Sequence, residues 1–147
     1  MMRGKLAVLA VLALAGCATG PTLHETRASL PPAPTDKARI YFYRTGSPIG
    51  SAIQPSIMLN SQKIGDSVPG GVFFCDVKPG TYAATVSTEV EKSAVINAAA
   101  GQQYYVKMDW GFGWIVARVH METVPPVVGE AETQALSVLA NTTCPTA

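Results

Sequence analysis

The sequence predicts an all-β protein, a single antiparallel β-sandwich of about seven to eight short strands with a short C-terminal helix. Short runs of β-branched and aromatic residues recur about every ten residues, which is the usual spacing of strands in sandwiches and barrels. Turn-forming residues such as Pro79-Gly80 and Gly101 separate these runs. Apolar and polar residues alternate within the last two runs, as in a sheet with one buried face.

The chain begins with the three parts of a bacterial secretory signal. A basic start precedes an apolar run from Leu6 to Ala15, and small residues follow it. This run is too short to span a membrane, which takes roughly 20 residues. The tetrapeptide Leu14–Cys17 resembles the lipobox of bacterial lipoproteins, in which the cysteine takes a diacylglycerol through a thioether and carries palmitate-like acyl chains. We therefore expect residues 1–16 to be removed as a lipoprotein signal peptide; the alternative is an ordinary signal peptide cut elsewhere.

The mature chain is nearly neutral. Removal of residues 1–16 takes away two of the eleven basic residues and leaves nine basic against ten acidic ones. Nucleic-acid binding requires a clustered excess of Lys and Arg, so we expect no nucleic-acid partner. The expected contact with the membrane is the covalent lipid on Cys17, because two or three acyl chains anchor a protein stably.

The next segment reads as a disordered tether. Residues 17–36 are rich in Pro, Thr and Ala and show no apolar periodicity. At roughly 3.3 Å per residue, such a segment would hold the domain up to about 60 Å from the lipid headgroups. We expect the sandwich domain to occupy residues 37–147.

The strands are expected where β-favouring residues cluster between turns. The predicted strands are Arg39–Arg44, Ser56–Leu59, Lys63–Val68, Val72–Val77, Thr81–Ser87, Ser93–Ala98, Gln103–Asp109 and Ile115–Glu122. Pro79-Gly80 fits a type II turn that joins two adjacent strands. Glu130–Ala140 shows the one helical apolar stripe and is the predicted helix.

Alternation predicts which side chains are buried in the last two strands. On the core face we place Tyr104, Val106, Met108, Ala117, Val119 and Met121. On the solvent face we place Tyr105, Lys107, Asp109, Arg118, His120 and Glu122. The two strands should therefore form a hairpin with one buried face and one solvent-exposed face.

Two cysteines follow Cys17. Cys75 and Cys144 could form a disulfide, since an exported protein meets an oxidising compartment in a Gram-negative cell. Two free thiols are the alternative, because the sequence does not fix the distance between their Cα atoms.

Several segments resemble a bacterial envelope family known only as a domain of unknown function. The resemblance rests on Ala38–Arg44, Leu59–Asp66, Gly70–Phe74, Asp76–Tyr82 and Gly101–Val106. It implies a lipoprotein with a sandwich similar to the transthyretin-like and carboxypeptidase-regulatory-like domains. It supplies no catalytic or binding residues. Ser61 stands where the family usually has glycine, a departure that disfavours a tight type I′ turn at Asn60-Ser61.

Residues with catalytic or binding chemistry are few. Two histidines, one of them in the tether, give no set of metal ligands, so no metal site and no cofactor are predicted. His120 is the histidine of the folded region, and a charged solvent face is the simpler interpretation of its strand. The aromatic cluster Trp110, Phe112 and Trp114 either closes one end of the core or forms an exposed binding surface.

These features predict a membrane-anchored envelope lipoprotein that acts as a non-enzymatic binding or structural module. Its expected partner is an envelope protein or peptidoglycan. The alternative is a small-ligand carrier or a hydrolase-like enzyme with a site around His120, Tyr105 and Arg118. Ala18 follows the lipidated cysteine where many inner-membrane lipoproteins have aspartate, so the periplasmic face of the outer membrane is the expected location.

Overall fold

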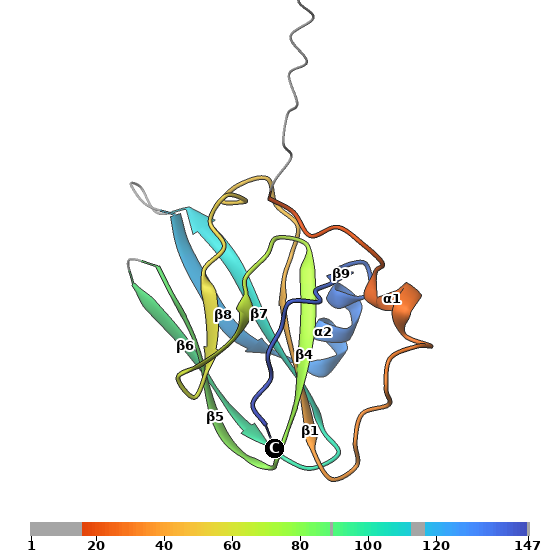
Figure 1. Ribbon diagram of the computed structural model, residues 1–147. Coiled ribbons are helices and arrows are strands. Elements are labelled where there is room, and N and C mark those ends of the chain that lie inside the picture. The colour runs from red at the N-terminus through yellow and green to blue at the C-terminus, as the bar shows by residue number, and fades with distance from the viewer. Residues whose placement is uncertain (1–15, 89, 113–116, 147) are drawn as a thin grey trace, which may run out of the picture.

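The computed structural model describes residues 16–88, 90–112 and 117–146, and its strands form two stacked sheets with short helices beside one of them (Figure 1). The strands are β1 (Ala38–Arg44), β2 (Ser56–Leu59), β3 (Gln62–Asp66), β4 (Gly71–Val77), β5 (Gly80–Ser87), β6 (Glu91–Ala98), β7 (Gln103–Phe112), β8 (Ala117–Val124) and β9 (Ser137–Val138). The helices are α1 (Leu23–Thr26) and α2 (Pro126–Thr133). The predicted all-β sandwich with a short C-terminal helix is therefore confirmed.

The five-stranded sheet is mixed, so the prediction of purely antiparallel pairing is wrong there, whereas every pair of the four-stranded sheet is antiparallel. One sheet has the order β8-β7-β1-β4-β9 and the other the order β3-β2-β5-β6. Strand β1 pairs antiparallel with β4 but parallel with β7, and β4 pairs parallel with β9. Parallel neighbours need long crossover connections, and here the chain passes through the second sheet between β1 and β7. Alternation within a strand carries no information about such distant partners.

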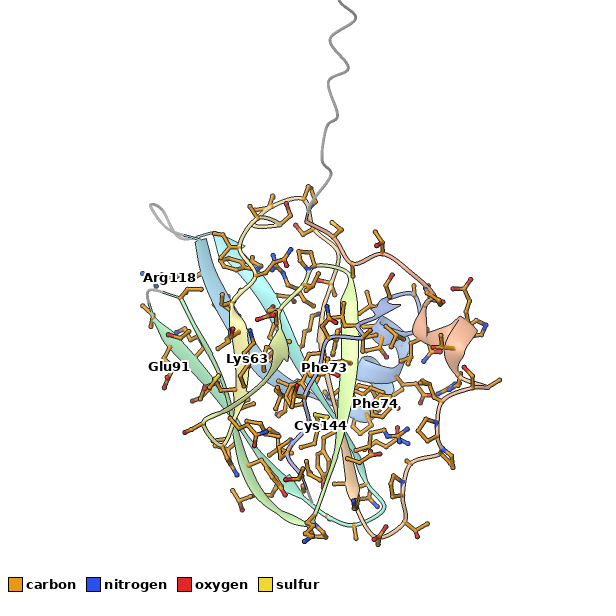
Figure 2. The ribbon with its side chains drawn as sticks, viewed as in Figure 1. Lys63, Phe73, Phe74, Glu91, Arg118 and Cys144 are labelled. Atoms are coloured by element: carbon orange, nitrogen blue, oxygen red, sulfur yellow. A yellow bond between two sulfur atoms is a disulfide. The ribbon has the colours of Figure 1, made fainter. Side chains whose placement is uncertain are left out.

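The core lies between the two sheets and is filled by side chains from alternate strand positions. Ile40 and Phe42 of β1 are fully buried there, opposite Ile57 and Leu59 of β2. Phe73 of β4 points into this core, whereas Phe74 points to the other side of the sheet (Figure 2). The predicted core residues Val106, Met108 and Val119 are also buried.

The five-stranded sheet is buried on its second face as well. Tyr105 is 4% exposed, so its prediction as a solvent-facing residue is wrong. Helix α2 lies over it: a Cβ atom added at Gly129 would be 2.1 Å from Tyr105 Cγ. Only glycine permits the helix to approach so closely. Lys107 also lies under α2, and its Nζ is 2.9 Å from Glu132 Oε1.

Residues 17–36 pack against this second face, so the expectation of a disordered tether is wrong for this segment. Thr22 and Glu25 form a capping box that starts α1, and Leu23 is 6% exposed beside Leu136. Backbone hydrogen bonds join Leu23 to Leu136 and Val138 to Pro21. A single buried leucine and backbone pairing to a distant strand give no periodic signal in the sequence.

Helix α2 begins and ends earlier than predicted. Pro126 occupies the first helical turn, where proline is favoured because its missing N–H needs no partner. The helix ends at Thr133, and the predicted helical residues that follow include β9, which extends the edge of the sheet beside β4. Leu136, just before β9, is buried, and Val138 and Leu139 are half-buried.

Two connections also differ from expectation. Asn60 and Ser61 have φ values of 47° and 67°, so the two-residue connection between β2 and β3 adopts the left-handed backbone of a type I′ turn without a glycine. Asn60 helps to hold it, since its side-chain oxygen accepts a hydrogen bond from Ala83 N. Pro79-Gly80 does not join adjacent strands but carries the chain from one sheet to the other.

Glu132 links α2 to the sheet and makes stability depend on pH. Its carboxylate accepts hydrogen bonds from the Tyr43 hydroxyl and the Lys107 ammonium, and these hold the pKa of Glu132 below its ordinary value of 4.5. A lowered pKa stabilises the folded state above the unfolded value, and the stabilisation is lost as pH falls through the folded value.

We expect Glu132→Gln to reduce the free energy of unfolding by about 1 kcal/mol at neutral pH, because the amide loses the charge-assisted bonds. The deficit should be smaller at about pH 3 than at neutral pH, because the carboxyl of the unmodified protein loses its charge as the pH falls through its lowered pKa. Urea unfolding at the two pH values measures this. Glu91→Gln, on an exposed position of β6, is the control. A deficit that is equal at both pH values would contradict the assignment.

Candidate functional site

Cys17 lies against the folded domain. The backbone N–H of Ala18 donates to the Pro69 carbonyl at 2.8 Å, and Gln54 Nε2 donates to the Gly16 carbonyl at 2.9 Å. Both chain neighbours of Cys17 are thus held by loops at one end of the sandwich. The Cys17 thiol is free and the residue is exposed. The candidate lipid-attachment residue is therefore accessible to chemistry but fixed in place.

The loop beside Cys17 is uncharged and partly apolar. Residues 45–55, which we call the anchor-side loop, contain no Asp, Glu, Lys, Arg or His. Ile49 and Ile53 in this loop are 47% and 45% exposed. In Figure 1 the anchor-side loop lies at the same end of the molecule as the start of the described chain.

Arg44 supports this loop from inside. Its side chain is buried at the end of β1, where Nη1 donates to the carbonyls of Ile53 and Ser67 and Nη2 donates to the carbonyl of Gly50. Burial lowers the pKa of Arg44 to about 10, and the guanidinium therefore stays protonated at neutral pH. A charged donor that holds loop carbonyls fixes the loop conformation.

Trp110 packs against the same guanidinium, whose carbon lies 4.9 Å from the centre of the ring. Gly50, with φ of 71°, passes so close that an added Cβ would be 3.0 Å from the ring. Arg44 Nε, Ser67 Oγ and Trp110 Nε1 are buried here without a hydrogen-bond partner among the described residues. Buried polar atoms of this kind are ordinarily satisfied by ordered water.

The predicted aromatic surface is placed in part. Trp110 is half-buried beneath the anchor-side loop, as in the interpretation that the cluster closes one end of the core. The side chain of Phe112 and all of Trp114 lie outside the described residues.

The strands do not bring together the residues of the predicted catalytic or carrier site. His120 is paired with Asp109 and Arg118 with Gly111, and both side chains are exposed on β8. Figure 2 shows Arg118 at the edge of the molecule. Tyr105 is paired with Val124, six residues along β8 from Arg118. At 3.4 Å per residue, the backbone positions of Tyr105 and Arg118 are therefore about 20 Å apart along the strands. A single small substrate cannot touch all three.

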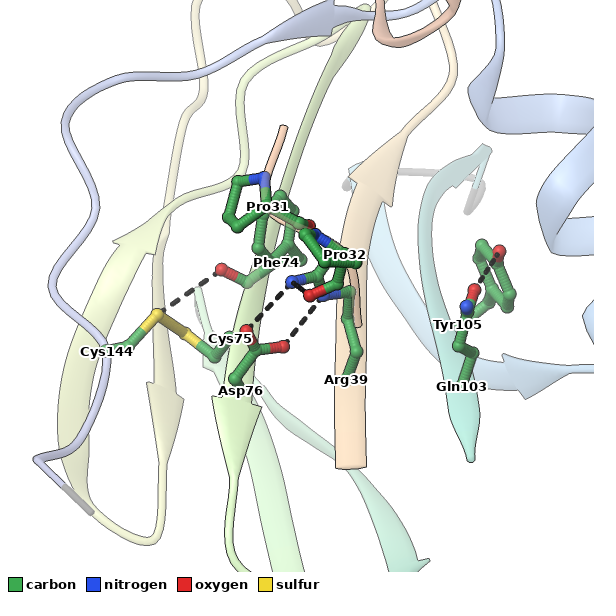
Figure 3. Close-up of polar contacts among 9 residues, drawn as sticks. All are labelled: Pro31, Pro32, Arg39, Phe74, Cys75, Asp76, Gln103, Tyr105 and Cys144. Carbon is green, nitrogen blue, oxygen red and sulfur yellow. Dashed lines mark hydrogen bonds and ion pairs between the residues drawn. A yellow bond between two sulfur atoms is a disulfide. The ribbon is translucent and has the colours of Figure 1, made fainter. Parts of the chain in front are cut away.

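Tyr105 instead lines a cavity of about 160 Å³ beneath the N-terminal segment, together with Leu23, Arg27, Tyr41, Gln103 and Gln134. The rings of Tyr41 and Tyr105 stack with their centres 4.8 Å apart, and burial raises the pKa of Tyr105 to about 12. Its hydroxyl donates to Gln103 Oε1 (Figure 3). Ligand pockets usually measure about 300–1,000 Å³, so this space is small for a carrier.

Cys75 and Cys144 form a disulfide with their Cα atoms 5.4 Å apart, which decides between the bridged and free alternatives in this structure (Figure 3). Cys75 lies in β4, and Cys144 lies in the C-terminal tail that crosses from β4 towards β3.

The described residues hold neither a cluster of metal ligands nor a membrane-spanning helix. No group of three or more His, Cys, Asp or Glu side chains there is arranged to hold a metal ion. No helix within the described ranges has the length and hydropathy to cross a membrane.

Sequence reasoning missed the two arginines of β1. Arg39 and Arg44 are 3% and 1% exposed, although both were expected at the ends of a strand without special roles. Their position within a dense apolar and aromatic run was a usable signal, because a charge inside a central strand must find polar partners.

Comparison with known proteins places the chain in a family. An uncharacterized protein of Haemophilus influenzae is 27% identical over 124 residues, which cover 81% of this chain and 73% of the relative. Residues 34–120, more than half of the chain, match the family described as protein of unknown function (DUF2846). The matched region runs from just before β1 to within β8 and so contains most of both sheets. The chain belongs to the DUF2846 family.

Proposed function

We propose that this protein is a bacterial envelope lipoprotein, anchored through lipid on Cys17, whose sandwich domain acts as a non-enzymatic binding or structural module. The observation that carries the proposal is the exposed, free Cys17 at the end of a lipobox-like tetrapeptide. A diacylglycerol thioether together with an amide-linked acyl chain would anchor the domain without any membrane-spanning segment.

The cysteine chemistry supports export. Disulfides persist in oxidising compartments such as the periplasm and are rare in the cytosol. The bridge between Cys75 and Cys144 uses both of those thiols, so Cys17 is the cysteine left with a free thiol. Ala18 next to it supports sorting to the periplasmic face of the outer membrane. The two-sheet fold supports a further proposal, kinship with the transthyretin-like and carboxypeptidase-regulatory-like sandwiches.

The arrangement of polar residues supports a non-enzymatic role. Tyr105 is buried under α2, while His120 and Arg118 stand exposed on another part of the sheet. An acid–base or nucleophilic mechanism requires its groups within hydrogen-bond reach of one another. An envelope protein or peptidoglycan is the proposed partner, with no nucleic acid.

The test is mass spectrometry of the full-length protein expressed with its own signal in a Gram-negative host. We expect the mature N-terminal peptide to begin at Cys17 with the mass of the acyl groups added, and the protein to fractionate with outer membranes on a density gradient. Cys17→Ser should abolish the added mass and release the protein from the membrane pellet. An unmodified Cys17, or a mature chain that starts elsewhere, would overturn the proposal.

A further inference from the structure

We infer that the domain lies directly on the lipid surface, with Ile49 and Ile53 of the anchor-side loop inserted at the headgroup boundary. The inference rests on the lipid attachment proposed above and adds to it an orientation and a membrane-contact surface. Three features of the structure support it: the position of Cys17, the composition of the neighbouring surface and the rigidity of the loop.

The first step is that little free chain separates Cys17 from the domain. Ala18 is hydrogen-bonded to Pro69, and consecutive Cα atoms are 3.8 Å apart. Further along, the Ser137 hydroxyl donates to Gly20 O, and Arg39 donates to the carbonyls of Pro31 and Pro32. A lipid on Cys17 would therefore bring the bilayer against this end of the sandwich.

The second step is that the surface next to Cys17 suits a bilayer. Gly46 of the anchor-side loop lies against Gly70, where an added Cβ would be 4.0 Å from Gly70 Cα, and Gly70 follows the Pro69 that holds Ala18. The loop therefore lies beside the point of attachment in the mature chain. It offers Ile49 and Ile53 as exposed side chains and has no charge to desolvate. Apolar side chains at the headgroup boundary gain from the removal of their surface from water.

The third step is that the loop is held in shape before it meets lipid. The Arg44 guanidinium binds carbonyls of Gly50 and Ile53, and the Ile53 N–H donates to Gly50 O at 3.0 Å. A loop that is already ordered loses little conformational entropy on contact. Together, the position of Cys17, the uncharged surface beside it and the ordered loop make the bilayer that carries the anchor the expected partner of this surface.

The test uses hydrogen exchange on the mature chain from Cys17, which retains nearly all of the described fold, coupled through its free thiol to a maleimide phospholipid. Vesicles of phosphatidylethanolamine and phosphatidylglycerol carry the coupled protein, and the uncoupled protein is the reference. We expect amides of residues 45–55 to exchange about tenfold more slowly on the vesicle. Amides of residues 99–102, at the opposite end of the sheet, should not change.

The double variant Ile49→Ser, Ile53→Ser should lose this protection, whereas Val95→Ser should keep it. Val95 is the matched control because it is 61% exposed but lies on β6, away from the loop. Equal exchange of residues 45–55 on and off the vesicle, or protection that survives the double variant, would overturn the inference. Coupling through the thiol is independent of acylation in cells, so a failure of Cys17 to be acylated would refute the proposed function alone.

Discussion

Removal of the disulfide is expected to lower the free energy of unfolding by about 4 kcal/mol, because the bridge closes a long loop in the unfolded chain. The two cysteines are 69 residues apart in sequence, and chain-entropy stabilisation grows with the logarithm of that length. The variant is Cys75→Ala, Cys144→Ala, and the measurement is urea unfolding of the mature chain. A loss of this size approaches the whole stability of many domains.

The tail that carries Cys144 gives a structural reason to expect a loss that large. Leu139 N donates to the Val72 carbonyl of β4, and Thr143 N donates to the Ile64 carbonyl of β3. The tail thereby joins an edge of each sheet, and the bridge to Cys75 fastens it. Without the bridge, the tail has only a few backbone bonds to close this side of the sandwich.

Two comparisons make the disulfide prediction decisive. Cys17→Ser should unfold like the unmodified chain, because Cys17 is exposed and unpaired. Reduction of the unmodified chain should reproduce the loss seen in the double variant, which separates the bridge from the volume of the two side chains. A loss below about 1 kcal/mol in both experiments would contradict the loop-closure argument.

The strands could be predicted because their signals are local. Each predicted strand overlaps an observed one, and Ser56–Leu59 matches β2 at both ends. Alternation also placed Val106, Met108 and Val119 correctly in the core. Those signals come from the pleat itself, in which successive side chains face opposite sides.

What the sequence did not reveal is the third layer of the fold. The second face of the five-stranded sheet is covered by α1, α2 and the side chain of Leu136, which are short segments with few apolar residues each. Tyr105 was expected in solvent because alternation separates the two faces of a sheet but does not show that a second face is covered by other elements. The fixed position of Cys17 was missed because it depends on the hydrogen bond between Ala18 and Pro69, which are far apart in the sequence.

Arg39 holds the N-terminal segment to the sheet at Pro31 and Pro32, and loss of its partner should be costly. Its Nε and Nη2 bind the Asp76 carboxylate at 2.7 and 2.9 Å, and the guanidinium carbon lies 4.0 Å from the centre of the Phe74 ring (Figure 3). The Arg39 side chain is 4% exposed. We expect Asp76→Ala to lower the free energy of unfolding by about 3 kcal/mol, because it leaves a buried guanidinium without its counter-ion.

The matched control is Lys63→Ala, which breaks the exposed pair of Lys63 with Asp66 and should cost less than about 1 kcal/mol. A second variant, Arg39→Leu with Asp76→Leu, removes both charges and should recover part of the loss. It also removes the donors that hold Pro31 and Pro32, so trypsin should cut after the exposed Arg27 faster than in the unmodified chain. If Asp76→Ala costs no more than Lys63→Ala and cleavage after Arg27 is unchanged, Arg39 does not fasten the N-terminal segment at Pro31 and Pro32.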